Sequence, residues 1–567
     1  MRQAIASIRT RFPAVGLLIV LVVSAAALLP GTVSLPVVDR DEARFAQASR
    51  QMLEATDLQG WIVPRVGERA RLNNPPLIYW LQTGSAWVAT SGDATKDAIW
   101  MYRVPSILAA LATAALVWGI GRRMFDSTTA LVAGVLIGTC PLVVFDAHMA
   151  RADEVLLAVT TAAQAMLWWC WRERDRTGGL PFVATALFWL FVGMGTMTKG
   201  PITPFVCGAT ALALAFVEGR WRWLWALRPW LGVVIVGVVV APWLIALVQT
   251  MGWDAVLTFV DEEVVRRASS GVEGHTGPPG YHLILMTVLF WPGSLLATAG
   301  VLFALKRVWS ARSTSSAELF LLAWLLPSWL AFELVGTKLP HYVLPLYPAL
   351  ALLLARAFIV GVERLPNAKG VLAEVGFALW VVLGLALATM PLALVWIVES
   401  TPSTGVIVAS ALGSAVTAFL IGGAYVWLRK GKMLRTVGWS VGAVVLCQAS
   451  VLGVVLPSLS SIWISPRLIE LVERDAGVRS VDATFPPLAS QGFGEDSLVY
   501  LSRAKVVMTK DAAAFLLAHP EGYAIVPELE AASIERTTNA VRIGSVRGFD
   551  YSDGKTYELC VLRARAE

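Results

Sequence analysis

The stretch PAVGLLIVLVVSAAALLPGTV, residues 13–33, runs directly into SLPVVDRDEARFAQASRQMLEA, residues 34–55. A helix that crosses a bilayer needs about 20 mostly apolar residues, and the first segment supplies them. Within the second segment, DEARFAQASRQMLEA is amphipathic, which is typical of a helix lying on a membrane surface. The pair therefore predicts a membrane-spanning helix followed by an interfacial helix that begins with acidic residues.

The composition of the whole chain also indicates a membrane protein. Of the 567 residues, 56% are hydrophobic and 15% are charged, whereas a typical soluble domain carries about 25% charged residues. The net charge of +6 arises from short basic clusters between apolar runs, which the positive-inside rule explains. This arrangement argues against nucleic-acid binding, and the five cysteines predict no disulfide framework.

About thirteen apolar runs are long enough to be spans. The basic residues cluster in alternate connecting loops, on the same side as Arg2, Arg9 and Arg11, and such loops are typically cytoplasmic. No small-residue cleavage site follows the first run, so we expect a retained span. An odd number of spans places everything after residue 457 outside. The predicted spans lie near residues 13–33, 101–121, 128–146, 153–171, 180–198, 201–217, 229–250, 281–305, 317–336, 342–361, 371–398, 405–428 and 436–457.

Three predicted outer segments are unusually long. Loops 34–100 and 251–280 are the longest between spans, and the second ends in a Gly/Pro-rich stretch that is typical of a mobile loop. The tail after residue 457 loses the long apolar runs and alternates strand-like stretches, SLVYLS (497–502) among them, with the helical DAAAFLLAH (511–519). The sequence thus predicts an α-helical polytopic membrane domain over residues 1–457 and a small α/β domain over residues 458–567.

Charged residues gather at the outer ends of the predicted spans, where they are costly and usually functional. Lys and Arg at headgroup depth suit a lipid phosphate, and a carboxylate can take the proton of an acceptor hydroxyl during sugar transfer. Each group also has a structural interpretation, as a solvated acid, a lysine reaching toward headgroups or a structural histidine. The set comprises Asp39, Arg40, Asp41, Glu42, Arg44, Asp146, His148, Arg151, Asp153, Glu154, Lys199, Arg266, Arg267 and Lys338.

Five motifs resemble those of one family in order and spacing. They are VDRDEARFAQASRQML (38–53), WIVPR (61–65), NNPPLIYW (73–80), MTKGP (197–201) and TKLPHYVLPLYP (337–348). Together they resemble the lipid A aminoarabinose transferases (ArnT) and their wider group. That group is related to the protein O-mannosyltransferases within the membrane-embedded GT-C glycosyltransferases.

The resemblance implies an inverting glycosyltransferase in the bacterial inner membrane, with its active site facing the periplasm. Its donor would be a sugar, 4-amino-4-deoxy-L-arabinose or a related one, carried on undecaprenyl phosphate. Its acceptor would be lipid A or another envelope glycolipid or glycan, and we expect a monomer surrounded by membrane lipids.

The resemblance also implies roles for individual residues. Asp41 would be the catalytic carboxylate, and Asp153 the second acidic residue. His275 is the one candidate metal ligand; whether a divalent cation takes part stays open, and no other cofactor is predicted. Residues beside the site or near the acceptor would be Asp39, Glu42 and His275, and those that hold the donor phosphate or substrate would be Arg44, Asn74, Lys199, Arg267, Lys338 and Tyr342.

One departure from the family pattern concerns the cavity charge. The aminoarabinose transferases carry Glu-Lys where this chain has Asn73-Asn74, and an amide brings no charge. Arg71 lies close enough in sequence to supply the missing cation. The departure does not change the predicted reaction class, but the sequence no longer specifies which sugar is transferred or which acceptor receives it.

Three other functions are open to a chain with this pattern. The first is a protein or peptide O-glycosyltransferase with the same donor. The second, a lipid or glycan transporter, is disfavoured because repeated halves and paired broken helices are absent from the sequence pattern. The third, a non-catalytic scaffold, leaves the gathering of Asp41, Lys199, Arg267 and Lys338 without a reason.

Overall fold

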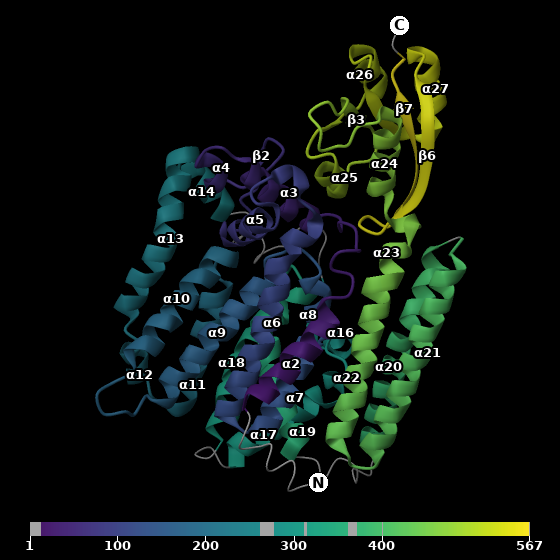
Figure 1. Cartoon of the computed structure of the whole chain (residues 1–567). Coiled ribbons are helices and arrows are strands. Elements are labelled where there is room, and N and C mark those ends of the chain that lie inside the picture. The colour runs from purple at the N-terminus through teal and green to yellow at the C-terminus, as the bar shows by residue number, and fades with distance from the viewer. Residues whose placement is uncertain (1–12, 261–276, 311–314, 361–370, 400, 566–567) are drawn as a thin grey trace.

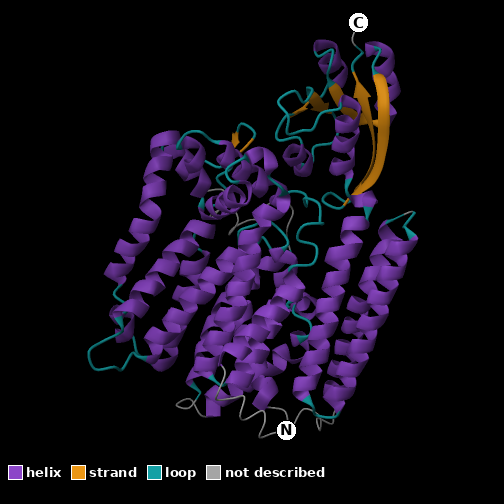
Figure 2. Ribbon diagram, viewed as in Figure 1, coloured by secondary structure: helices purple, strands orange, loops and turns teal. Residues whose placement is uncertain are grey.

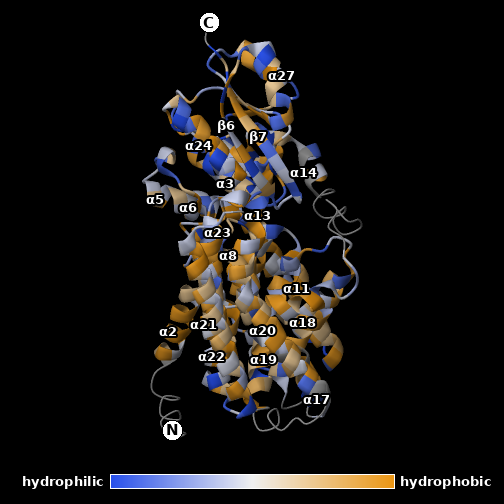
Figure 3. Cartoon of the chain, turned by 90° about the vertical axis from the view of Figure 1, so that its right-hand side faces the viewer, coloured by the Kyte–Doolittle hydropathy of each residue, from blue (hydrophilic) through white to orange (hydrophobic). Residues whose placement is uncertain are grey.

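The structure, a computed structural model, describes residues 13–260, 277–310, 315–360, 371–399 and 401–565. A bundle of long helices forms one body, and a smaller domain with a sheet stands at the end opposite the N-terminus (Figures 1 and 2). Figure 3 shows hydrophobic residues concentrated along the bundle and hydrophilic ones around the smaller domain. The predicted class, a helical polytopic membrane protein with a small C-terminal α/β region, is confirmed.

Most of the described residues of every predicted apolar run are helical. The helices are α2 (Pro13–Leu28), α6 (Ile99–Met124), α7 (Ser127–Gly138), α8 (Pro141–Ala147), α9 (Asp153–Arg172), α10 (Phe182–Lys199), α11 (Ile202–Glu218), α13 (Pro229–Met251), α16 (Tyr281–Leu289), α17 (Ala297–Ser310), α18 (Ser316–Leu334), α19 (Tyr347–Val360), α20 (Val371–Val398), α21 (Thr404–Arg429) and α22 (Met433–Ser450).

Among the described residues, fewer than thirteen helices have the length and hydropathy of an uninterrupted span. Within the described ranges, eight helices are long and apolar enough to cross a membrane, or nine if the bent pair α7 and α8 forms one span. The pair bends by 50° next to Pro141, whose ring cannot continue a helix. The run at 281–305 is likewise broken between α16 and α17, and α2 and α11 are short. Hydropathy alone does not predict these interruptions.

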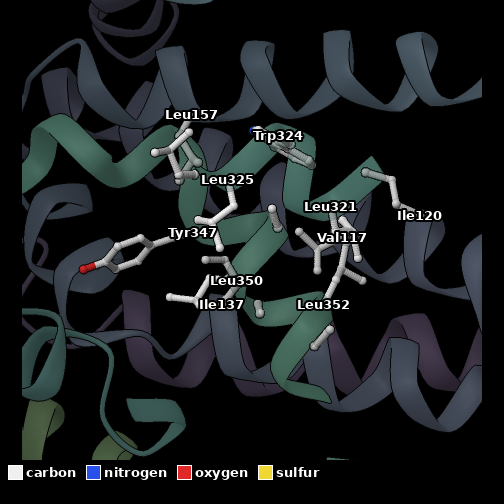
Figure 4. Packing of buried hydrophobic residues seen from close by; sticks show 14 of the residues in the cluster. Val117, Ile120, Ile137, Leu157, Leu321, Trp324, Leu325, Tyr347, Leu350 and Leu352 are labelled. Atoms are coloured by element: carbon white, nitrogen blue, oxygen red, sulfur yellow. The ribbon is translucent and has the colours of Figure 1, made fainter. Parts of the chain in front are cut away.

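The centre of the bundle is a close-packed apolar core. Figure 4 shows Leu321, Trp324 and Leu325 of α18 packed against residues of α19, α6 and α7. Trp324 is fully buried, and its indole N–H donates to the Pro345 carbonyl at 3.1 Å. Interlocked side chains of this kind hold the outer ends of the helices in fixed positions.

Short elements cover the outer end of the bundle. They are α3 (Asp41–Glu54), α4 (Gln59–Ile62), the hairpin of β1 (Arg65–Val66) and β2 (Arg69–Ala70), α5 (Leu77–Thr90), a 3₁₀ turn at Ala94–Lys96 and α14 (Trp253–Val260). The predicted interfacial helix is α3, but nine of its fourteen residues are buried. It packs against α5 and the C-terminal domain, so it is a protein-covered helix rather than one lying on lipid.

The C-terminal domain begins after α22 continues into a π-helical turn (Val451–Val455) and α23 (Leu456–Ser458). Its five-stranded sheet has the order β4-β3-β5-β7-β6, in which β3 is parallel to β4 and β5, and β7 is antiparallel to β5 and β6. The elements are α24 (Ile464–Ala476), β3 (Leu488–Ser490), α25 (Asp496–Leu501), β4 (Val506–Met508), α26 (Ala512–Ala518), β5 (Tyr523–Pro527), α27 (Glu528–Thr538), β6 (Val541–Asp550) and β7 (Lys555–Arg563).

One predicted strand in this domain is wrong. SLVYLS (497–502) lies mostly in helix α25, which starts with Asp496, an acid that favours a helix N-terminus. Leu498 and Tyr500 are buried because α25 packs on α3 and α24. The division of domains at residue 457 stays a proposal.

Candidate active site

A polar cavity lies at the end of the bundle that α3 covers, and residues of α3 form part of its wall. Its volume is about 140 Å³, enough for several water molecules. Five cations, two carboxylates and a histidine line it, so the wall carries a net positive charge. The lining residues are Arg40, Asp41, Arg44, Phe45, Arg71, Asn73, Asn74, Arg151, Asp153, Lys199, Thr337, Leu339, His341 and Tyr342.

A buried ion pair fixes the start of α3. Glu42 and Arg103 of α6 are both 0% exposed, and the Arg103 guanidinium donates to both Glu42 carboxylate oxygens at 2.8 Å. A buried pair is stable only when its remaining polar atoms are also bonded, and here they are. Glu42 accepts from the N–H of Val38 and Ala150, and Arg103 donates to the carbonyls of Thr32, Leu35 and Pro36. Glu42 thus anchors the helix and does not line the cavity.

Asp41, the residue before Glu42, lies on the cavity wall. Its side chain is 48% exposed, and one oxygen is 3.4 Å from Nη2 of Arg71. Its partial burial raises its pKa, but the charges of Arg151, Arg71 and Lys199 outweigh that effect and hold the pKa below its usual value. Asp41 is therefore ionised at neutral pH and can accept a proton or a hydrogen bond from a ligand in the cavity.

Asp153 and Lys199 form a second ion pair in the cavity wall. Lys199 Nζ at the end of α10 donates to Asp153 Oδ1 at the start of α9, at 2.7 Å. The same carboxylate oxygen is 3.8 Å from His341 Nε2. The lysine ammonium also lies 6.0 Å from the Tyr342 ring centroid, within range of a cation–π interaction. These contacts hold one cation at the cavity.

Two of the four arginines that line the cavity are bonded to carboxylates outside it. Arg44 Nε is 2.7 Å from Asp496 of α25, and Arg151 donates to Asp146. Their charges still contribute to the field in the cavity, because Coulomb interactions fall off slowly in a low-dielectric site. The Arg71 guanidinium stacks on Phe45, and its Nε has no hydrogen-bond partner within the described ranges.

The structure brings together most, but not all, of the residues predicted from the sequence. Asp41, Arg44, Asn74, Asp153, Lys199 and Tyr342 line the cavity. Lys338 does not; it is buried and its Nζ donates to the Val335 carbonyl at 3.1 Å. Asp39 faces the C-terminal domain, where it accepts from the Ser497 N–H. Arg267 and His275 lie outside the described residues.

Sequence reasoning missed His341 as a cavity residue. His341 stands in the motif TKLPHYVLPLYP (337–348), directly before Tyr342. Its place in that motif is the sequence signal that could have indicated a position in the cavity. For a metal, the described part of the chain holds no group of three or more His, Cys, Asp or Glu side chains in a suitable arrangement. The candidate metal ligand His275 falls outside that part.

Sequence comparisons show similarity to glycosyltransferases over part of the chain. A family model described as dolichyl-phosphate-mannose-protein mannosyltransferase matches residues 73–245. The undecaprenyl phosphate-alpha-4-amino-4-deoxy-L-arabinose arabinosyl transferases of Edwardsiella ictaluri and Erwinia tasmaniensis are 29% and 30% identical over 336 and 318 residues. These matches cover 58% and 56% of this chain and 56% and 54% of the relatives' own length, a little over half.

Structural comparisons extend the likeness to nearly the whole chain. The crystal structure of ArnT from Cupriavidus metallidurans bound to undecaprenyl phosphate matches with a TM-score of 0.73 at 18% identity, covering 97% of both chains. The archaeal oligosaccharyltransferase AglB from Archaeoglobus fulgidus matches with a TM-score of 0.54 at 11% identity, covering 96% of this chain and 73% of that chain. At these identities the likeness concerns the fold.

The helical bundle and the C-terminal sheet have the GT-C fold of these solved structures, and the apolar helices indicate a multi-pass membrane protein. Within that class the chain is ArnT-like, as the motifs of its outer loops predict.

Proposed function

We propose that this protein transfers a sugar from undecaprenyl phosphate to an acceptor hydroxyl at the outer face of the bacterial inner membrane. The observation that carries the proposal is an ionised carboxylate, Asp41, in a cavity lined by five cations. Support comes from relatives named as undecaprenyl phosphate-dependent arabinosyl transferases and from an ArnT structure of the same fold named as bound to undecaprenyl phosphate.

In the proposed reaction the acceptor oxygen attacks the anomeric carbon of the donor sugar from the side opposite the phosphate. The bond between that carbon and the phosphate oxygen breaks, and the phosphate leaves with the electron pair, so the configuration inverts. The acceptor proton passes to Asp41, whose low pKa keeps it ionised and available as a base. The departing phosphate needs no proton, because the surrounding cations stabilise its negative charge.

Asp153 has a supporting part in this scheme. Its carboxylate holds Lys199 at 2.7 Å, and the lysine is one of the cations available to the phosphate. Loss of Asp153 would free the lysine side chain to adopt other rotamers.

Arg71 is proposed to replace the cation that Asn74 cannot supply. Among the cavity cations Arg44, Arg151 and Lys199 are bonded to aspartates at short range. The Arg71 guanidinium stacks on Phe45 and makes a longer hydrogen bond of 3.4 Å to Asp41. Its side chain is 11% exposed and its Nε is unbonded within the described residues. A buried donor without a partner is destabilising, so a phosphate oxygen there would satisfy it.

Binding measurements test the role of Arg71. Arg71→Ala is expected to weaken the binding of undecaprenyl phosphate to the purified protein by about 10- to 100-fold, since a hydrogen bond to a charged group is worth about 1.5–3 kcal/mol. Arg69→Ala, at an exposed position two residues before Arg71, is the matched control. Equal affinities for Arg71→Ala and the unaltered protein would refute this role.

Mass spectrometry of envelope lipids and glycans tests the activity as a whole. Cells with the gene deleted should lose one glycosylated species, and the chain with Asp41→Asn should fail to restore it, with activity lower by about 10²- to 10⁴-fold. Glu68→Gln, an exposed acid on the same outer loop, should restore it fully. A deletion that changes no glycoconjugate would contradict the enzyme hypothesis, and full activity of Asp41→Asn would remove Asp41 from its role.

A second candidate acceptor is a protein hydroxyl. The matching family model carries the description of a protein mannosyltransferase, which supports this alternative over residues 73–245. The same deletion strain distinguishes the two, because a protein acceptor would appear as a lost glycopeptide with unchanged glycolipids.

A further inference from the structure

The C-terminal domain contacts α3 at the end that carries the cavity residues. Arg44 Nε is 2.7 Å from Asp496 Oδ2, and Asp496 is the first residue of α25. The next residue, Ser497, donates its N–H to Asp39 Oδ1 at 2.8 Å. In return, the Asp39 N–H donates to the Tyr551 hydroxyl at 2.9 Å. Three contacts from one domain thus surround the turn that presents Asp41.

That turn has an unusual backbone. Arg40, between Asp39 and Asp41, has φ 62° and ψ −108°, a left-handed conformation that non-glycine residues rarely adopt. Such a residue costs about 1–3 kcal/mol and persists only where its surroundings hold it on both sides. On one side the C-terminal domain holds Asp39, and on the other Arg103 holds Glu42. The direction of the Asp41 side chain therefore depends on both anchors.

The contact continues to the far end of α3. Arg50 Nη1 donates to the Tyr500 carbonyl at 2.6 Å, and its guanidinium carbon lies 3.9 Å from the Tyr500 ring centroid. Arg503 reaches back to Glu54 at 2.7 Å and to Asp97 at 2.8 Å. A helix of fourteen residues is about 20 Å long, so the domain bonds to α3 along its whole length. Helix α3 cannot rotate relative to the domain without breaking these bonds.

We propose that the C-terminal domain completes the active site by fixing the positions of Asp41 and Arg44. Tyr551, Ser497 and Asp496 are then positioning residues, since they act on the reaction through α3. This inference rests on the proposed function for its catalytic consequence. A displacement of about 1 Å in a reacting group can lower a rate by about 100-fold, and release of the strained turn at Arg40 would cause a displacement of that kind.

Two conservative variants of the full-length protein test this inference. Tyr551→Phe removes only the acceptor of the Asp39 N–H, and Asp496→Asn removes only the charge that holds Arg44. Tyr551→Phe is expected to lower kcat by about 10- to 100-fold while KM for the donor changes much less. Asp496→Asn is expected to raise KM for the donor, because Arg44 borders the cavity, and Asp496→Glu should recover part of that loss.

Tyr557→Phe is the matched control. Tyr557 lies on β7 of the same domain and donates to Asp553, so its variant loses one hydroxyl hydrogen bond without touching α3. It should keep both kcat and KM. A drop equal to that of Tyr551→Phe, or a fall in the unfolding temperature that accounts for the lost activity, would mean that the domain has only a structural role and would overturn the inference.

Hydrogen exchange separates this inference from the proposed function. In Tyr551→Phe and Asp496→Asn, the amides of residues 39–46 should exchange faster than in the unaltered protein and in Tyr557→Phe, whether or not a substrate is known. Faster exchange in a protein that transfers no sugar would support the positioning and refute the function. Unchanged exchange together with unchanged kinetics would refute the positioning.

Discussion

Helices α3 and α21 are stabilised by different surroundings. In α21 only seven of 26 residues are buried, and its arginine, Arg429, pairs with Glu374 at an exposed position. In α3 nine of fourteen residues are buried, and Glu42, Arg44 and Arg50 bond to distant parts of the chain. A helix that faces lipid needs only apolar side chains on its surface, whichever they are. Helix α3 instead depends on particular side chains elsewhere in the chain that bond to it. The functional cavity lies in the region that depends on partners.

The largest expected difference between the two regions is in the stability contributed by the ion pairs Glu42–Arg103 and Glu374–Arg429. Arg103→Met should leave Glu42 charged and buried without a partner, which typically costs about 3–5 kcal/mol of stability. Arg429→Met, the equivalent change at the exposed pair of α21, should alter stability little. Thermal unfolding of the purified variants in one detergent measures both. Similar unfolding temperatures for the two variants would contradict the contrast between the regions.

Adjacent glycines of α21 show where packing matters even in the lipid-facing region. A Cβ at Gly423 would overlap the ring of Trp439 on α22, whereas one at Gly422 would meet nothing within 4 Å. Gly423→Ala should therefore destabilise the protein by about 1–3 kcal/mol, and Gly422→Ala should leave it as stable or slightly more so. The same unfolding assay compares the pair, and a larger loss at Gly422 would show that the contact between α21 and α22 is misassigned.

The smallest expected effect is a pH dependence of domain contact. Burial raises the pKa of Asp39 to about 6 and that of Glu495 to about 8, and the hydrogen bond with Asp550 also raises the latter. Since both pKa values exceed the ordinary ones, the folded protein binds more protons than the unfolded chain at neutral pH. The stabilisation is fully present below about pH 4 and is lost as pH rises through 6 and 8.

Unfolding temperatures measured at pH 5, 7 and 9 follow this effect. The unfolding temperatures should fall toward pH 9. Glu521→Gln, which removes an exposed acid of the same domain, is the control and should show the same fall as the unaltered protein. Glu495→Gln imitates the protonated acid beside Asp550, so it should flatten the decline. An identical decline in both variants would exclude Glu495 as the cause. The charges of Asp496 and Arg44, which also face this contact, are unchanged in either variant.

The sequence by itself determined the membrane class, the thirteen apolar runs and the gathering of charges at one face. These features depend on local hydropathy and charge, because a bilayer acts on each segment separately. It also indicated Asp41, Arg44, Asp153, Lys199 and Tyr342, whose motifs resemble those of a known family and whose side chains do line one cavity.

Only the tertiary structure decided which of the charged residues share that cavity. Glu42 pairs with Arg103, 61 residues away, and Arg44 with Asp496 in another domain; local pattern carries no information on such pairs. Lys338 turns to a backbone carbonyl instead of the cavity. The helix at α25, predicted as a strand, forms because α3 and α24 bury its apolar side chains. Contacts between distant segments, rather than residue type, select the conformation at each of these positions.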